Sequence, residues 1–316
     1  MKRLDCNAKD MGTKMLEFIE MNWNKITLED KPVIDRFYKI QDSANCETTF
    51  ANNWLWAPHY EVKYGIIHDM LVFYADKEEV SVRYPIGEGD KKPAIDWLKS
   101  YFAAIGQPFL MHLVSTKQFA EMEALFPGEF EIQYDRDAAD YIYESQKLAT
   151  LTGKKLHGKR NHINRFKELY PDWSYETITE QNREECIAMA YKWRELSGCA
   201  DDPEKSAEFC VTLQALKNMT VLGLKGGLLR AGNEVVAFSL GEPCSTETYV
   251  VHIEKAYSHV QGAYPMINQQ FVLHEAMEYE FVNREEDTGV EGLRKAKLSY
   301  QPVHLLEKGT VRLKTR

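Results

Sequence analysis

The sequence lacks the cysteine and histidine spacings of common metal sites. Its 316 residues include six cysteines, and none of them form a C-x-x-C pair. This excludes a zinc ribbon and argues against a disulfide scaffold. The nine histidines show no H-x-x-x-H or H-E-x-x-H spacing, so we predict no metal site. We interpret the cysteines as buried or idle thiols: Cys6, Cys46, Cys186, Cys199, Cys210 and Cys244.

Long apolar runs and a positive charge balance are also missing. No segment reaches the roughly 20 apolar residues of a membrane span, and Asp5, Asp10 and Glu17 interrupt the stretch where a signal peptide would be apolar. We therefore expect a cytoplasmic location. The net charge of -9 argues against a general binder of nucleic acid or anionic membranes.

The length favours two domains, because single domains usually hold roughly 100 to 200 residues. In the first half we predict a helix after the cap Thr27, strands near 61–68, 70–75 and 79–84, a helix ending at Gly106, a strand at 108–114, a helix at 116–126 and a strand at 130–135. In the second half we predict helices near 183–197 and 203–217, strands near 219–230, 234–241 and 246–254 with turns at Gly226–Gly227 and Gly232–Asn233, a helix at 265–279, a strand at 281–285 and a helix near 291–298. The similar order predicts an α/β (α+β) class with domains 1–150 and 151–316, each a mixed, mainly antiparallel sheet flanked by helices.

A basic strip lies between the two halves. From Lys154 to Lys167 there are six basic residues and no acidic one. Two interpretations stay open: a solvated face of a connecting helix, or an anion site for a phosphate-bearing donor, a nucleic-acid backbone or lipid head groups. The basic residues are Lys154, Lys155, Lys159, Arg160, Arg165 and Lys167.

Charged residues end two predicted strands of the second half. Period two places His252 and Glu254 on one face of the strand 246–254. In the next strand it places Asn283, Glu285 and Asp287 on one face, with Arg284 and Glu286 on the other. Such carboxylates beside an arginine suit acid–base chemistry or the anchoring of an ammonium group, and they suit a structural ion-pair network with Arg294 and Lys297 equally well.

A glycine turn separates these two strands. The segment His259–Tyr264 precedes a helix that starts near Pro265, a residue suited to a first helical turn. Backbone amides at a strand-to-helix turn can bind an anion. We therefore expect Gly262 to lie in a binding site.

Four blocks in this order carry a family resemblance: YIYESQKLATLTGKKLHGKRNHINRF, VVHIEKA, GAYPMINQQF and VNREEDTGVEGLRKAKLSYQP. They resemble the phosphatidylglycerol lysyltransferase C-terminal-domain family, most strongly from Tyr141 to Lys308. The resemblance implies two tandem GCN5-related N-acyltransferase-like domains and an acyltransferase that moves an aminoacyl group from an aminoacyl-tRNA-type donor to an amine or hydroxyl. It also implies that the site is lined by Glu254, Gly262, Asn268, Asn283, Arg284, Glu285, Asp287 and Lys297.

The roles expected at this site follow from the chemistry of acyl transfer. We expect Glu254 or Glu285 to accept the acceptor's proton, Tyr300 to donate a proton to the leaving group, and His252 to line the substrate site. No resident cofactor is predicted. The acetyl-CoA signature, Gln or Arg, then Gly, then Gly or Ala, would read His259, Gly262 and Tyr264 and differs at two of three positions.

Alternatives to a tRNA donor stay open at this point. One is a CoA-dependent N-acyltransferase with an atypical phosphate turn. Another is a non-catalytic scaffold that binds tRNA or another polyanion. Peripheral contact with an anionic lipid surface is compatible with the basic strip.

Overall fold

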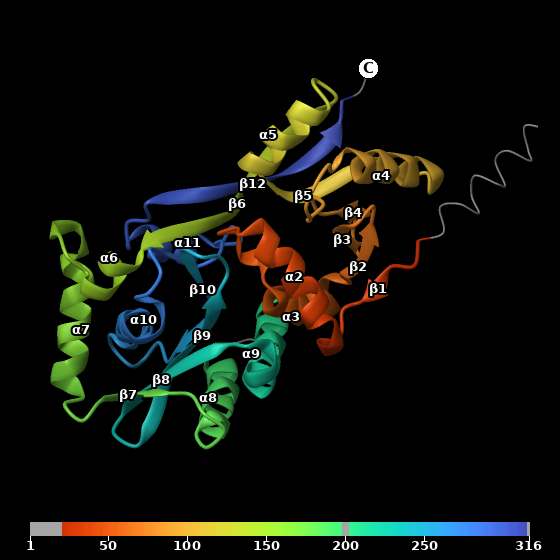
Figure 1. Cartoon of the computed structure of the whole chain (residues 1–316). Helices are drawn as coiled ribbons and strands as arrows, with labels where there is room; N and C mark the ends of the chain where they lie inside the picture. Colours follow the sequence, from red (N-terminus) through yellow and green to blue (C-terminus); the bar gives the residue numbers. More distant parts are fainter. Residues whose placement is uncertain (1–20, 198–201, 315–316) are drawn as a thin grey trace, which may run out of the picture. The chain divides into compact units, whose positions relative to one another are not determined.

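The computed structural model describes residues 21–197 and 202–314 (Figure 1). They form two compact units from interleaved segments. Unit 1 contains the described residues up to Ile26, Tyr60–Tyr134 and the segment from Gly309, whereas unit 2 contains Thr27–His59 and Asp135–Lys308. The division into domains 1–150 and 151–316 stays a prediction. The following residues named above lie outside the described ranges: Asp5, Cys6, Asp10, Glu17 and Cys199.

Unit 1 is a sheet with two helices. Its elements are β1 (Asn24–Lys25), β2 (Lys63–Ile67), β3 (Met70–Ala75), β4 (Ser81–Val82), α4 (Lys92–Ala104), β5 (Leu110–Ser115), α5 (Thr116–Leu125), the start of β6 (Phe130–Glu144) and the end of β12 (His304–Leu313). The strand order is β1-β2-β3-β4-β5-β12-β6, and β4 pairs in parallel with β5 through Val82 and Met111. The core is aromatic, with Trp23 stacked on Tyr74 at 4.7 Å between ring centroids.

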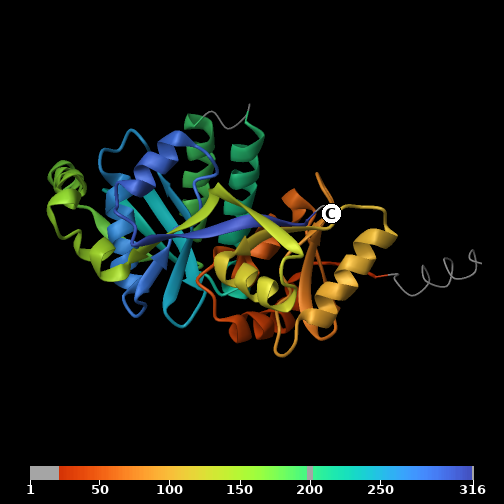
Figure 2. The same cartoon turned by 90° about the horizontal axis from the view of Figure 1, so that it is seen from above.

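Unit 2 carries the predicted site. Its elements are η1 (Leu28–Asp30), α2 (Lys31–Gln41), η2 (Cys46–Thr48), α3 (Phe50–Tyr60), the end of β6, α6 (Ser145–Thr150), η3 (Lys154–Leu156), α7 (His157–Leu169), β7 (Ser174–Thr177), α8 (Arg183–Leu196), α9 (Pro203–Leu222), β8 (Lys225–Ala231), β9 (Glu234–Pro243), β10 (Thr248–Ala256), α10 (Ala263–Phe271), the π-helix η5 (Val272–Ala276), β11 (Phe281–Asn283), α11 (Glu291–Leu298) and the start of β12. The strand order is β12-β6-β11-β10-β9-β8-β7. Helix α10 packs on one face of β8–β10, and α8 packs on the other (Figures 1 and 2).

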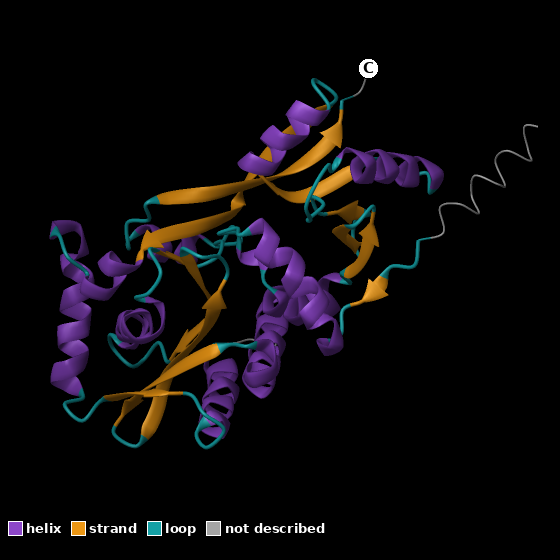
Figure 3. Cartoon of the chain, viewed as in Figure 1, coloured by secondary structure: helices purple, strands orange, loops and turns teal. Residues whose placement is uncertain are grey.

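Both units follow one plan: four antiparallel strands, then a parallel step to a fifth strand. Figure 3 shows the strands in orange and the helices beside them in purple. The parallel steps are β4 to β5 in unit 1 and β10 to β11 in unit 2. The predicted class, α/β with mixed, mainly antiparallel sheets flanked by helices, is confirmed. No helix within the described ranges combines the length and the apolar character that a bilayer crossing requires.

One predicted turn is wrong. Gly226 and Gly227 lie inside strand β8 and pair with Leu240 and Ser239 of β9. A Cβ atom on Gly226 would press on the Leu240 side chain, and one on Gly227 would meet the ring of Tyr175. These glycines give room to neighbouring side chains, and the chain turns earlier, at Gly223, where helix α9 ends with φ 79°. Strands β7 and β12 and the second half of β6 were not predicted.

Gly262 ends the loop between β10 and α10 and has a φ of 84°. Helix α7 covers it closely, because a Cβ atom at this position would overlap the carbonyl oxygen of His162 and lie 2.9 Å from Cβ of Phe166. Only glycine satisfies both the left-handed backbone and this close approach.

We expect Gly262→Ala to destabilise the protein by at least about 1–2 kcal/mol, because an L residue is strained at this φ and its methyl group overlaps α7. Urea unfolding followed by circular dichroism measures the effect. The matched control is Gly158→Ala in α7, where the added Cβ meets nothing within 4 Å and should be neutral or stabilising. Equal midpoints for the two variants would contradict the packing described.

Candidate functional site

The two parallel strands of unit 2 separate where the predicted site residues lie. Pairing between β10 and β11 joins Thr248–Val250 to Phe281–Asn283, after which β10 continues to Ala256 while β11 ends. Glu254 in β10 and Arg284 just after β11 face each other across this separation, with Arg284 Nη2 2.9 Å from Glu254 Oε1. Both side chains are mostly buried: 11% of the Arg284 side chain and 14% of the Glu254 side chain are exposed.

We call the group built on this ion pair the Arg284 cluster; its members are Lys159, Glu254, Asn268, Arg284 and Tyr300. Asn268 in α10 donates from Nδ2 to the second oxygen of Glu254 at 2.9 Å. The Arg284 guanidinium lies 4.7 Å from the centroid of the Tyr300 ring, and Lys159 Nζ of α7 lies 3.9 Å from the same centroid. The cluster thus holds two cations and one carboxylate.

Electrostatics separate the two cations. Burial opposes the charge on Arg284, but the Glu254 carboxylate together with Tyr143 and Tyr300 outweighs it, so the pKa of Arg284 is raised. Lys159 has the opposite shift: burial and then the charge of Arg284 lower its pKa to about 8. Burial raises the pKa of the Tyr300 hydroxyl, which therefore stays protonated.

Three buried polar atoms around Glu254 have no hydrogen-bond partner among the described residues. They are Arg284 Nη1, Asn268 Oδ1 and Ser239 Oγ. Ser239 stands directly opposite Glu254 in the β9–β10 register. Because Asn268 Nδ2 is bonded to Glu254, its oxygen is the atom left over. Unpaired buried polar groups are costly, and a donor and an acceptor together suit a polar ligand.

His252 lies in a different group, on the other side of the strand. Its Nδ1 lies 2.7 Å from Glu285 Oε1 and its Nε2 lies 3.1 Å from Glu242 Oε1. Both ring nitrogens can donate only in the imidazolium form. Burial alone would lower the pKa of His252, but the hydrogen bonds to these two carboxylates outweigh it and raise the pKa to about 10.

The predicted common face for His252 and Glu254 is therefore wrong. A β-bulge between Val251 and Ile253 shifts the register against β9, and the alternation of side chains changes at that point. Glu254 faces Asn268 of α10, whereas His252 faces Glu285 and Thr49.

The predicted faces after β11 are wrong in part. Asn283 and Glu285 share a side as predicted. Glu286, which was predicted on the other face, lies on this side too, because its Oε2 is 3.8 Å from Cys46 Sγ. Asp287 instead binds Arg294 and the Tyr141 hydroxyl. The cause is the backbone of Glu285, whose φ of 58° ends the period-two geometry.

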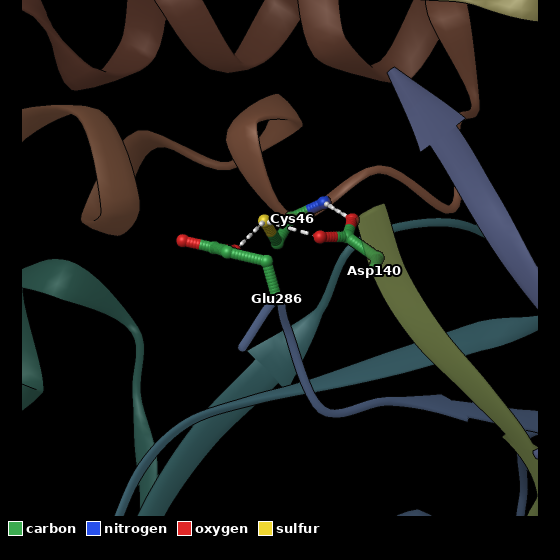
Figure 4. A group of neighbouring side chains, drawn as sticks. All are labelled: Cys46, Asp140 and Glu286. Atoms are coloured by element: carbon green, nitrogen blue, oxygen red, sulfur yellow. Dashed lines mark hydrogen bonds between the residues drawn. The ribbon is translucent and has the colours of Figure 1, made fainter. Parts of the chain in front are cut away.

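A further charged group is built around Lys308, which is fully buried. Figure 4 shows three of its members, Cys46, Asp140 and Glu286. Its Nζ lies 2.8 Å from Asp140 Oδ1 and 2.8 Å from Glu47 Oε1. Cys46, Asp140 and Glu286 bring one sulfur and two carboxylates within 4.8 Å of one another, and Lys308 Nζ lies 3.7 Å from Cys46 Sγ. The ammonium group supplies the positive charge that these acceptors need.

The remaining predicted substrate residues serve the backbone and the core. Asn283 is buried and donates to the carbonyl oxygen of Ala44 and to Asp140. Lys297 Nζ donates to the carbonyl oxygens of residues 284, 285 and 286. Buried Asp287 accepts hydrogen bonds from Arg294, Arg136 and Tyr141. Asp287 is therefore part of a structural ion pair with Arg294, which was one of the two interpretations of these carboxylates.

The basic strip divides into members with different partners. Lys154, Lys155 and Arg165 are exposed, and Arg165 pairs with Glu168 at 3.2 Å. Arg160 donates to the carbonyl oxygens of Leu151 and Gly153, which fixes the start of α7. Lys159 alone among the six residues of the basic strip enters the Arg284 cluster.

Several charged residues of unit 2 were missed from the sequence: Glu47, Asp140, Glu242 and Lys308. Each lies in a strand or a short helix. Asp140 lies in the apolar stretch AADYIY, where a lone carboxylate among buried residues was a signal for a partner charge. Lys308 had no such signal, because β12 was not predicted.

We expect the imidazolium of His252 to make stability depend on pH. Its folded pKa of about 10 lies above the ordinary 6.5, so the stabilisation is complete below pH 6.5 and is lost as pH rises toward 10. The free energy of unfolding of the wild type should fall more steeply over this window than that of His252→Gln, by up to about 1.4 kcal/mol per pH unit. Urea titrations at several pH values measure both slopes. Exposed His157→Gln is the control and should keep the wild-type slope; parallel lines for His252→Gln and the wild type would refute the buried imidazolium.

Comparison with known proteins gives one family and one fold. The sequence model of the family described as phosphatidylglycerol lysyltransferase, C-terminal, matches residues 38–311. A solved conserved protein of unknown function from Bacteroides thetaiotaomicron is 40% identical over 93% of this chain and 100% of that chain, with a TM-score of 0.87. The structure of L-PGS from Bacillus licheniformis is 16% identical and covers 94% of this chain and 95% of that one, with a TM-score of 0.63.

A curated relative matches over a shorter length. An uncharacterised protein of Mycoplasmoides gallisepticum is 25% identical over 183 residues. This chain spans 56% of that relative's length. The family match and the fold shared with the L-PGS structure confirm the predicted fold class, with mixed, mainly antiparallel sheets flanked by helices.

Proposed function

Because the chain belongs to the phosphatidylglycerol lysyltransferase C-terminal family, we propose that it is an aminoacyltransferase whose site is the Arg284 cluster. The donor is an aminoacyl ester of the tRNA type, and the acceptor carries a hydroxyl or amine. The L-PGS structure from Bacillus licheniformis, which shares the fold, supports this class of reaction.

The observation that carries the proposal is the unpaired donor and acceptor beside Glu254. Arg284 Nη1 can donate to the carbonyl oxygen of an aminoacyl ester and can hold the negative charge that develops there during attack. Asn268 Oδ1 can accept a hydrogen bond from the α-ammonium group of the same ester. An aminoacyl group presents this pair of functions on neighbouring carbons.

Glu254 places both groups. Its two oxygens hold Arg284 and Asn268 at 2.9 Å each, which fixes the two remaining polar atoms relative to each other. The carboxylate also attracts the α-ammonium of the donor. In the transfer, the acceptor oxygen or nitrogen bonds to the carbonyl carbon, the bond to the ribose oxygen breaks, and the acceptor's proton moves to the leaving oxygen.

The exposed part of the basic strip provides contacts for a polyanionic donor. Lys154, Lys155 and Lys167 are exposed, and they belong to the same segment as Lys159, which enters the cluster. A nucleic-acid backbone bound by such residues dissociates as salt is raised. Arg160 takes no part, because backbone carbonyls hold it.

Packing at Gly262 disfavours the CoA alternative. In a CoA-dependent enzyme of this fold the turn before the helix would face a diphosphate. In this chain α7 covers that glycine with the carbonyl oxygen of His162, an acceptor that repels phosphate oxygens. We therefore expect that the protein does not bind CoA.

Two conservative changes in the ion pair test the proposal. We expect Arg284→Lys and Glu254→Gln each to lower aminoacyl transfer by about 100-fold or more, because a rigidly held donor to the oxyanion is lost or misplaced. The assay follows radiolabelled amino acids from charged tRNA pools to phosphatidylglycerol vesicles and to small amines.

The controls come from a second arginine–carboxylate pair of unit 2, between Arg230 and Glu185 at 2.6 Å. Arg230→Lys and Glu185→Gln should keep wild-type transfer. Circular dichroism and tRNA binding at low salt check that all four variants fold. Equal activity in both pairs of variants, or acetyl-CoA binding by the wild type without tRNA binding, would overturn the assignment.

A further inference from the structure

Lys159 is the half-buried member of the basic strip that contacts an aromatic ring of the Arg284 cluster. Its Nζ lies 3.9 Å from the Tyr300 ring centroid, and no carboxylate or carbonyl within the described ranges pairs with it. Lys192 provides a contrast, since its Nζ lies 5.0 Å from the Tyr257 ring but pairs with Glu234 at 2.6 Å and is half exposed. Lys159 therefore contacts an aromatic ring while no carboxylate among the described residues forms an ion pair with it.

The charges that face Lys159 come from three elements. They are Arg284 after β11, Glu254 in β10 and the Tyr300 hydroxyl after α11. Glu254 is already shared between Arg284 and Asn268, so the positive charge of Arg284 is only partly compensated at the amine. With a pKa of about 8, roughly a tenth of Lys159 side chains are uncharged at pH 7, against about one in three thousand for an ordinary lysine.

We propose that Lys159 is the proton acceptor of the transfer reaction, an inference that rests on the proposed function. The uncharged amine takes the proton of the acceptor hydroxyl or amine as that group bonds to the ester carbonyl carbon. The resulting ammonium gives the same proton to the ribose oxygen when the carbon–oxygen bond breaks. Atoms and charge balance over the cycle, and no further reactant is needed.

The other titratable groups of the cluster are less suited to this step. Both oxygens of Glu254 are already occupied, one by Arg284 and the other by Asn268. Burial raises the pKa of the Tyr300 hydroxyl, so this hydroxyl keeps its proton. The Lys159 amine contacts the ring of Tyr300. Glu285 faces His252 on the other side of the strand.

Lys159→Arg separates this role from simple anion binding. Arginine keeps the positive charge and contacts phosphate at least as well as lysine, but it does not give up its proton. We expect Lys159→Arg to bind charged tRNA like the wild type and to lose about 100-fold or more of the transfer rate. The wild-type rate should rise with pH and level off near pH 8, and Lys192→Arg should keep both the rate and this profile.

A second measurement reads the amine without any transfer assay. At pH 7 a limiting amount of an activated acetyl ester should acetylate Lys159 before Lys192 and the other exposed lysines, as counted by peptide mass spectrometry. The expected excess over Lys192 is about tenfold or more, because the uncharged amine is the nucleophile.

Each outcome decides the proposal. Transfer by Lys159→Arg at half the wild-type rate or more would overturn it, and so would labelling no faster than that of Lys192. If the wild type transfers nothing while Lys159 is still labelled selectively, the proposed function fails and the catalytic role fails with it. Loss of transfer in Lys159→Arg with tRNA binding intact, together with selective labelling, supports it.

Discussion

The ion pair between Glu254 and Arg284 bridges the point where β10 and β11 separate, and the chemistry of unit 2 depends on it. Where the two central strands of a sheet separate, backbone groups lose their strand partners, and here an arginine is buried beside them. The Glu254 carboxylate compensates that arginine's charge, while Asn268 fixes the carboxylate from α10. Because both partners of Glu254 keep one polar atom without a partner, the separation becomes a place that recognises a polar ligand.

Neighbouring residues after β11 serve two sides of the sheet. Arg284 belongs to the cluster at the separation, and Glu285 holds the His252 imidazolium on the opposite side. Lys297 binds three successive carbonyl oxygens of this loop, which stabilises the left-handed backbone of Glu285 that makes the arrangement possible. Burying an ammonium group is costly. The three hydrogen bonds to loop carbonyls offset this cost, so the buried position of Lys297 depends on the loop keeping its conformation.

Local patterns in the sequence predicted the elements that act locally. The glycine turn at Gly262, the strand before it, the helix after it and the charged end of β11 follow from residue type and spacing, and the family blocks identified the fold class. The faces of β10 could not be predicted, because a bulge is set by the register against β9 and leaves no mark in the residue pattern. Nor could the Lys308 group, whose members Cys46, Asp140 and Lys308 are 94 and 168 residues apart and meet only through the sheet topology.

The interleaved segments of unit 2 impose an order on its synthesis. Cys46 and Glu47 leave the ribosome about 260 residues before Lys308, the residue that neutralises Glu47 and Asp140. Until then η2 and the second half of β6 carry carboxylates with no cation to bury them against. Unit 2 therefore cannot close as its N-terminal segment emerges, as most domains do during translation. Its folding has to wait until Lys308 is made, so over those residues of synthesis the growing protein depends on solvation of those carboxylates, or on a holding chaperone.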